Sequence, residues 1–133
     1  MLVLIADTDD TRRQSSQEFL QARGLSVASV ARVEEVVDIA QEACPEVVVL
    51  EWPDAPERGA VALAALRDRD ARVPVVVTSS DTTADTAIRC LKAGADDFVR
   101  RPFDLDELLA RIEALSRRNL IPRRPVIKAG PLA

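Results

Sequence analysis

Four side chains that could handle charge or a phosphoryl group stand at the ends of short apolar runs. These side chains are Asp7, Glu51, Thr78 and Arg101. Two carboxylates, a hydroxyl and a guanidinium can together hold a cation, bind an anion or take part in group transfer. If the apolar runs are parallel strands, their carboxyl ends meet at one edge of a sheet, where ligands bind in open α/β folds. The sequence therefore predicts one polar site at that edge.

The apolar runs that position these side chains are predicted to be β-strands. Three of them are nearly continuous in Val, Ile and Leu, which is typical of strands covered on both faces of a parallel sheet. The five runs cover residues 2–6, 25–30, 47–50, 73–78 and 98–99.

Amphipathic windows between the runs are predicted to be helices. Asp9 or Asp10 provides an N-cap for the first window, and Gly24 stops it. Asp104 and Glu107 have the spacing of a capping box at the start of the last. The five windows cover residues 10–23, 33–43, 59–70, 79–94 and 104–118. Alternating strands and helices predict an open, doubly wound α/β domain.

Composition limits the chain to one packed core. Its 133 residues are 47% hydrophobic and 30% charged, which suits a single domain. The sequence has no apolar run of ~18 residues and no basic-then-apolar leader, so we expect neither a membrane span nor a signal peptide. We expect a cytoplasmic protein without a membrane partner.

The composition excludes the usual zinc sites and histidine-based catalytic triads. The chain has no His, and Cys44 and Cys90 are isolated from each other in sequence. Both thiols are predicted to be reduced core residues. The net charge is −4, yet residues 117–133 hold five basic residues and no acid, so the rest of the chain is more acidic still. An acidic body repels nucleic acid, and any DNA contact must come from elsewhere.

Long stretches of the sequence resemble the receiver domain of two-component response regulators, which has a flavodoxin-like fold of five parallel strands and five helices. The resemblance covers residues 1–118, the predicted receiver domain. It is carried by LIADTDDTRR, VVVLEWPDAPERG, VVVTSS and LKAGADDFVRRPFDLDELLARIEAL. The tail IPRRPVIKAGPLA resembles the linker into a winged-helix DNA-binding domain of the OmpR/PhoB type, so residues 119–133 are predicted to be a basic linker toward such a domain.

The resemblance implies phosphoryl transfer from a histidine kinase to an aspartate, beside a magnesium ion held by an acidic pair. Glu51 matches the phosphoacceptor aspartate. Asp7 matches the first acid of the pair, Thr8 matches the second, and Asp9 lies one residue beyond. Further matches are Thr78 to the switch hydroxyl, Phe98 to the switch aromatic and Arg101 to the lysine that pairs with the phosphoryl group.

These substitutions predict an atypical receiver without catalytic residues. Thr8 removes a negative charge, so metal affinity falls to at most weak Mg²⁺ binding at Asp7. The longer Glu51 reaches into the phosphoryl volume, and Arg101 suits a carboxylate better than lysine does. We expect a Glu51–Arg101 contact that replaces metal and phosphoryl group, and independence from a histidine kinase. An alternative is that both residues have drifted and are energetically idle.

The resemblance also implies homodimerisation through the fourth helix, fifth strand and fifth helix, with DNA bound through the second domain. The apolar centre of that surface would be Ile88, Leu91 and Ala110, and its charged rim would be Asp96, Asp97, Lys92, Glu107, Arg111 and Arg118. Asp97 is predicted to pair with Arg111 of the partner. The alternative is a solvated helix face with intrahelical pairs such as Glu107 with Arg111.

Other functions stay open at this point. The altered pocket could bind a small-molecule effector whose anionic group faces Arg101. The sequence Asp7-Thr8-Asp9 reads DxD, as in magnesium-dependent phosphatases, although 133 residues leave no room for their cap domain. A conventional receiver would need another phosphoacceptor, and Asp54 is the nearest candidate.

Overall fold

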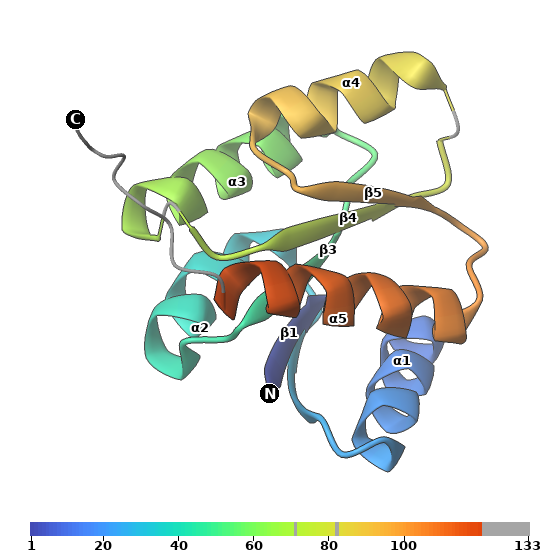
Figure 1. The fold of residues 1–133 in the computed structure, drawn as a ribbon. Helices are drawn as coiled ribbons and strands as arrows, with labels where there is room; N and C mark the ends of the chain where they lie inside the picture. The colour runs from blue at the N-terminus through green and yellow to red at the C-terminus, as the bar shows by residue number, and fades with distance from the viewer. Residues whose placement is uncertain (71, 82, 121–133) are drawn as a thin grey trace, which may run out of the picture.

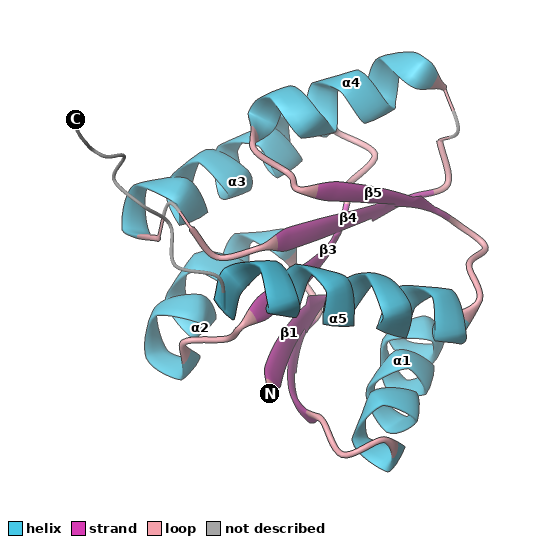
Figure 2. Ribbon diagram, viewed as in Figure 1, coloured by secondary structure: helices cyan, strands magenta, loops and turns pink. Residues whose placement is uncertain are grey.

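The sheet consists of five parallel strands (Figures 1 and 2). The computed structural model describes residues 1–70, 72–81 and 83–120. The strands are β1 (Leu2–Ala6), β2 (Ser26–Val30), β3 (Val47–Glu51), β4 (Val75–Ser79) and β5 (Asp97–Arg100). Their order is β2-β1-β3-β4-β5, and every neighbouring pair is parallel. The prediction of a doubly wound five-stranded α/β fold is confirmed.

Helices cover both faces of this sheet. They are α1 (Asp10–Ala22), the short 3₁₀ helix η1 (Val33–Glu35), α2 (Val36–Ala43), α3 (Pro56–Arg69), α4 (Ala84–Ala93) and α5 (Leu105–Leu120). In Figure 1, α1 and α5 lie on one face, and α2, α3 and α4 lie on the other. None of the helices in the described residues combines the length and hydropathy of a membrane span.

Two hydrophobic clusters follow from the alternation of side chains along the strands. Val3 and Ile5 of β1 point toward α1 and α5 and pack in a cluster with Leu20, Leu108 and Ile112. Leu4 and Ala6 point the other way and pack in a cluster that contains Val36, Leu63, Leu66 and Cys90. Because both faces are buried, the strands read as continuous apolar runs in the sequence.

The predicted helix boundaries are confirmed to within two residues, except for the starts of the third and fourth helices. Helix α4 begins at Ala84 after the N-cap Thr83, five residues later than predicted, because β4 extends to Ser79. The Asp9 carboxylate accepts the Arg12 amide at 2.9 Å and caps α1. Gly94 ends α4 with a φ of 116°, a conformation that favours glycine. Asp104 accepts the Asp106 amide at 2.8 Å at the start of α5. The Glu107 carboxylate accepts a hydrogen bond from Arg111 at 2.9 Å and not from the Asp104 amide, so the predicted capping box is not formed.

The third helix begins earlier than predicted. Pro56 occupies its first turn, where the missing N–H of proline costs nothing, and the helix starts there instead of at Gly59. Two of its apolar residues, Val61 and Ala64, are exposed, Val61 by 69%. Its buried residues are Gly59, Ala62, Leu63 and Leu66.

The prediction of two buried thiols is half wrong. Cys90 is buried in α4, and burial raises the pKa of its thiol to about 11. Cys44 is exposed. It ends α2 in the left-handed conformation, with a φ of 50°, because the following Pro45 disfavours a helical conformation at the preceding residue.

Trp52 is a buried packing residue at the start of the loop between β3 and α3. It is 6% exposed and lies against Gly59, where an added Cβ would come within 2.8 Å of the indole ring. The indole therefore closes over the first turn of α3. At the other end of the chain, α5 runs to Leu120, two residues beyond the predicted domain boundary at Arg118. The predicted linker beyond it, residues 121–133, lies outside the described residues.

Candidate functional site

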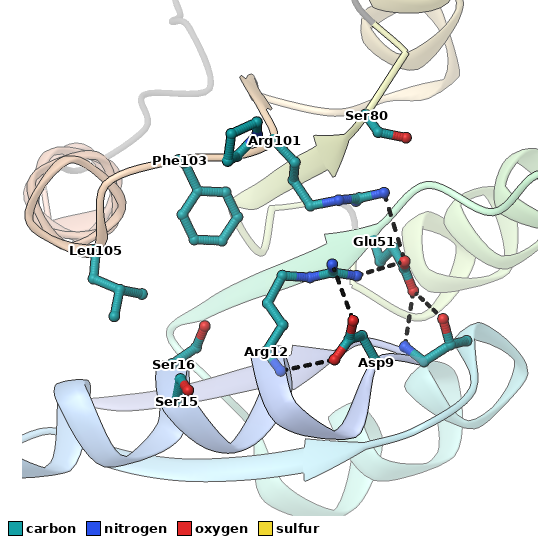
Figure 3. Close-up of a pocket in the computed structure, with 11 residues that line it drawn as sticks. Asp9, Arg12, Ser15, Ser16, Glu51, Ser80, Arg101, Phe103 and Leu105 are labelled. Atoms are coloured by element: carbon teal, nitrogen blue, oxygen red, sulfur yellow. Dashed lines mark hydrogen bonds and ion pairs between the residues drawn. The ribbon is translucent and has the colours of Figure 1, made fainter.

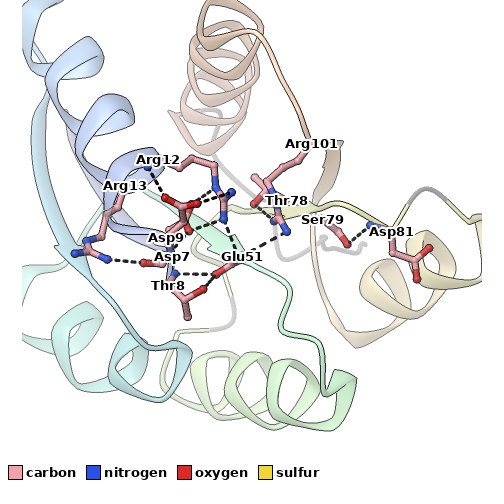
Figure 4. Close-up of polar contacts among 10 residues, drawn as sticks. All are labelled: Asp7, Thr8, Asp9, Arg12, Arg13, Glu51, Thr78, Ser79, Asp81 and Arg101. Carbon is pink, nitrogen blue, oxygen red and sulfur yellow. Dashed lines mark hydrogen bonds and ion pairs between the residues drawn. The ribbon is translucent and has the colours of Figure 1, made fainter.

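The structure brings the four strand-end side chains together at the carboxyl edge of the sheet (Figure 4). Asp7 directly follows β1, and Glu51 is the last residue of β3. Thr78 of β4 is paired in register with Glu51, and Arg101 directly follows β5. The positions of Asp7, Glu51 and Thr78 follow from the lengths of the apolar runs. Arg101 is partly buried.

Arg12 lies at the centre of this site, and the sequence analysis missed it. Its Nε and Nη2 atoms donate to the two oxygens of Asp7 at 2.6 and 2.7 Å. Nη2 also donates to Oε2 of Glu51 at 2.8 Å. The hydrogen bond to Asp7 and the charges of Asp7 and Glu51 raise the pKa of Arg12, against the effect of partial burial. One guanidinium from α1 thus bridges both carboxylates.

Thr8 supports the same arrangement from the other side of Glu51. Its backbone amide and its hydroxyl both donate to Oε1 of Glu51, each at 2.8 Å. Oε2 accepts from Arg12, so both oxygens of Glu51 carry hydrogen bonds. The alternative of an idle, solvated Glu51 is inconsistent with this geometry, since its side chain is only 14% exposed.

The predicted contact of Glu51 with Arg101 is present as a secondary interaction. Arg101 Nη2 lies 3.6 Å from Oε2 of Glu51, whereas Arg12 lies 0.8 Å closer to that atom. Arg101 Nη1 donates to the Thr78 hydroxyl at 3.1 Å. Burial and the nearby charge of Arg12 lower the pKa of Arg101. The principal partner of Glu51 is therefore Arg12.

The acidic residues present do not fit a magnesium site. Octahedral Mg²⁺ needs carboxylate oxygens at about 2.0–2.1 Å and keeps water in its other positions. Both oxygens of Asp7 are bound by Arg12, and Oδ1 also accepts the Asp9 amide at 2.9 Å. The Asp9 carboxylate caps α1, and its backbone hydrogen bonds lower its pKa. Residues 1–70, 72–81 and 83–120 hold no cluster of three metal-binding side chains.

Neither of the two residues predicted to form the switch takes part in the ion pairs of the site. Thr78 is buried, and its hydroxyl accepts the hydrogen bond of Arg101. Phe98 is half-buried and packs against the cluster beneath α2, α3 and α4. Asp54, the alternative phosphoacceptor, is exposed in the loop after β3.

A cavity of about 620 Å³ opens beside the ion pairs (Figure 3). It lies between α1 and the segment that joins β5 to α5. Arg12, Glu51 and Arg101 border it at the edge of the sheet, and Ser15 and Ser16 line it from α1. Its apolar lining comes from Pro102, Phe103 and Leu105.

The predicted dimer surface carries exposed apolar residues and ion pairs within one chain. Ile88 and Leu91 on α4 are each 49% exposed, and Lys92 and Ala110 are also exposed. Five of the six charged rim residues form ion pairs within the chain: Asp97 with Arg111 at 3.0 Å, Glu107 with Arg111 at 2.9 Å, and Asp96 with Arg118 at 3.2 Å and with Arg67 at 2.9 Å. The intrahelical pair between Glu107 and Arg111 is thus formed in the single chain.

Comparison with known proteins identifies the family. The family model described as the response regulator receiver domain matches residues 3–113. This chain belongs to that family. The receiver fold is also found by structural comparison: the Francisella response regulator 1452 receiver domain superposes with a TM-score of 0.80 at 27% identity, covering 88% of this chain and 97% of that one.

Two curated relatives of this receiver are transcriptional regulators. The transcriptional regulatory protein PrrA of Mycobacterium tuberculosis is 37% identical over 133 residues, which cover 98% of this chain and 57% of PrrA. The cell cycle transcriptional regulator CtrA of Caulobacter vibrioides is 30% identical over 132 residues, which cover 99% of this chain and 57% of CtrA. The chain spans a little over half the length of these relatives.

Proposed function

We propose that this receiver controls an attached DNA-binding domain without phosphorylation at the end of β3, and that it acts as a homodimer. The observation that carries the proposal is the bridge of Arg12 between Asp7 and Glu51. We assign Glu51 to the phosphoacceptor position, Asp7 and Asp9 to the acidic pocket, and Arg101 to the phosphoryl-pairing position.

The hydrogen bonds of Glu51 and the charge of Arg12 oppose phosphoryl transfer in two ways. A phosphoacceptor needs a carboxylate oxygen free to attack phosphorus, and both oxygens of Glu51 are engaged by Arg12 and Thr8. Phosphoryl transfer also needs a divalent cation beside the acceptor. A cation entering next to Arg12 would meet a positive charge, and the repulsion is strong where the groups are partly buried. The bidentate pair of Arg12 with Asp7 is itself one of the stronger ionic contacts in proteins.

A regulatory, non-enzymatic role agrees with the relatives. PrrA and CtrA carry names of transcriptional regulators and are considerably longer than this chain. In the proposal, the OmpR/PhoB-like tail after α5 leads to the DNA-binding domain. Dependence on a histidine kinase is lost together with the phosphoacceptor.

Dimerisation through α4, β5 and α5 is supported by the shape of that surface. Ile88 and Leu91 protrude from α4 and are half exposed. A shallow hollow of about 400 Å³ lies over α5, lined in part by Ala110 and Ala114. Small residues in a hollow and apolar residues on a ridge suit a twofold interface, in which each chain offers both features. The acids and bases around them would form its polar rim.

The test is exposure of the chain to acetyl phosphate, and separately to beryllofluoride, with Mg²⁺. We expect no phosphoryl adduct by intact mass and no movement of the ¹H–¹⁵N signals near residues 7, 51 and 78. The control is the triple variant Thr8→Asp, Arg12→Ala, Glu51→Asp, which recreates an acidic pair and an open acceptor and should respond to beryllofluoride. A stable adduct on Glu51 or Asp54 of the unmodified chain would contradict the proposal.

A further inference from the structure

The cavity beside the ion pairs has the size and the two-part lining of a small-molecule site. Its volume of about 620 Å³ lies within the range of about 300–1,000 Å³ that is usual for ligand pockets. Figure 3 shows Arg101 and Ser80 on one side of it and the Phe103 ring and Leu105 on another. Such a cavity has room for a charged group and an apolar body together.

Arg101 provides the cavity with an incompletely paired cation. Its side chain is only 12% exposed. A guanidinium can donate five hydrogen bonds, and among the described residues Arg101 donates one, to Thr78. Its carboxylate neighbour Glu51 is 3.6 Å away and is held more closely by Arg12. A sheltered cation with so few partners gains from an anion placed in the cavity.

The lining of the cavity has no net formal charge, which favours a singly charged anion over a doubly charged one. Arg12 and Arg101 contribute two positive charges, and Asp9 and Glu51 contribute two negative charges. A dianionic phosphate would be repelled by both carboxylates, whereas a planar carboxylate matches the guanidinium fork at lower charge.

We propose that the cavity binds a small aromatic carboxylic acid, whose carboxylate accepts hydrogen bonds from Arg101 and Ser80 and whose ring packs on Phe103, Pro102 and Leu105. This inference rests on the proposed function, because a phosphoryl group on β3 would compete for Arg101. It adds the chemical class of an effector and the residues that select it.

The test is a titration of the 133-residue chain with 1-naphthoate, followed by ¹H–¹⁵N NMR. Two matched probes accompany it: 1-naphthamide, which keeps the ring and lacks the charge, and inorganic phosphate, which lacks the ring. We expect saturable shifts at residues 15, 16, 80, 101 and 103–105, with naphthoate binding at least tenfold more tightly than either matched probe.

Variants separate the two halves of the site. Arg101→Gln should abolish the preference for naphthoate over naphthamide, whereas Phe103→Ala should weaken both naphthyl probes several-fold. Arg117→Ala, which removes an exposed charge elsewhere on α5, should leave binding unchanged. Absence of saturable shifts, equal affinity for acid and amide, or unchanged preference in Arg101→Gln would overturn the inference. A beryllofluoride adduct would instead overturn the proposed function, so the two failures are distinguishable.

Discussion

Arg12 supplies the positive charge that two sheltered carboxylates require. Asp7 is 6% exposed, and an ionised carboxylate at that depth is costly unless it is paired and hydrogen-bonded. Arg12 provides two hydrogen bonds to Asp7 and one to Glu51. Arg12 therefore makes the closest ion pairs of both carboxylates, and Arg101 adds a second positive charge 3.6 Å from Glu51.

Replacing Arg12 should destabilise the fold and open the pocket to cations. We expect Arg12→Ala to lower the free energy of unfolding by about 2–3 kcal/mol, below the ~3–5 kcal/mol of a fully buried pair, because the Arg12 side chain is 29% exposed. Arg12→Lys should lower the free energy of unfolding by less, since lysine keeps the positive charge. Urea denaturation measures both. Equal stability of all three proteins would argue against a structural bridge.

Millimolar Mg²⁺ should stabilise Arg12→Ala and leave the stability of the unmodified chain unchanged.

The sequence could predict which strand-end residues meet, and it could not select Arg12. The positions of Asp7, Glu51 and Thr78 follow from the apolar runs and from the rule that strand ends share one edge. Arg12 and Arg13 are adjacent in the first turn of α1, and only the rotation of that helix decides which one faces the sheet. Arg13 instead pairs with Asp10 at 2.6 Å and donates to the Asp7 carbonyl.

The loop between β3 and α3 is shaped by the packing of Trp52. The indole is buried, and its nitrogen has no hydrogen-bond partner among the described residues. Gly59 allows the ring to lie directly on the helix, since a Cβ there would also come within 2.9 Å of Pro53. The strands and most helix boundaries were predictable from apolar patterns and caps. This contact was not, because nothing in the pattern relates Trp52 to Gly59.

Gly59→Ala should displace the indole. Overpacking of a filled contact usually costs about 1–3 kcal/mol, which we expect to exceed the gain in helix propensity from alanine. Trp52 is the sole tryptophan, so a change in intrinsic fluorescence and a lower urea midpoint should appear together. Ala60→Ser, at the exposed neighbouring position, is the control and should leave the fluorescence spectrum unchanged. An unaltered spectrum in Gly59→Ala would show that the ring is not confined there.

Ion pairs on the face of α4, β5 and α5 can form within one chain or between two. Asp97 and Arg111 are 3.0 Å apart in the single chain. In a twofold dimer, Asp97 of each protomer could exchange this partner for the partner subunit's Arg111. The exchange replaces one exposed pair by another, so apolar contact at Ile88 and Leu91 would supply most of the affinity.

Charge reversal distinguishes the two arrangements. Asp97→Arg and Arg111→Asp should each weaken self-association, because like charges then meet across the interface. Mixing the two variants should restore a dimer, since the heterodimer regains both attractive pairs. Sedimentation equilibrium of each variant and of the mixture provides the measurement. Lack of recovery on mixing would indicate that the pair acts only within the chain.

Helix α5 connects the cavity with the C-terminal end of the receiver. Leu105, its first residue, borders the cavity, and its last residue is Leu120. At 1.5 Å per residue the helix is about 24 Å long, and a continuous helix of this length bends little. No proline interrupts it, so a displacement of its first turn at the cavity is expected to move the helix as one body and to reach the far end of the receiver.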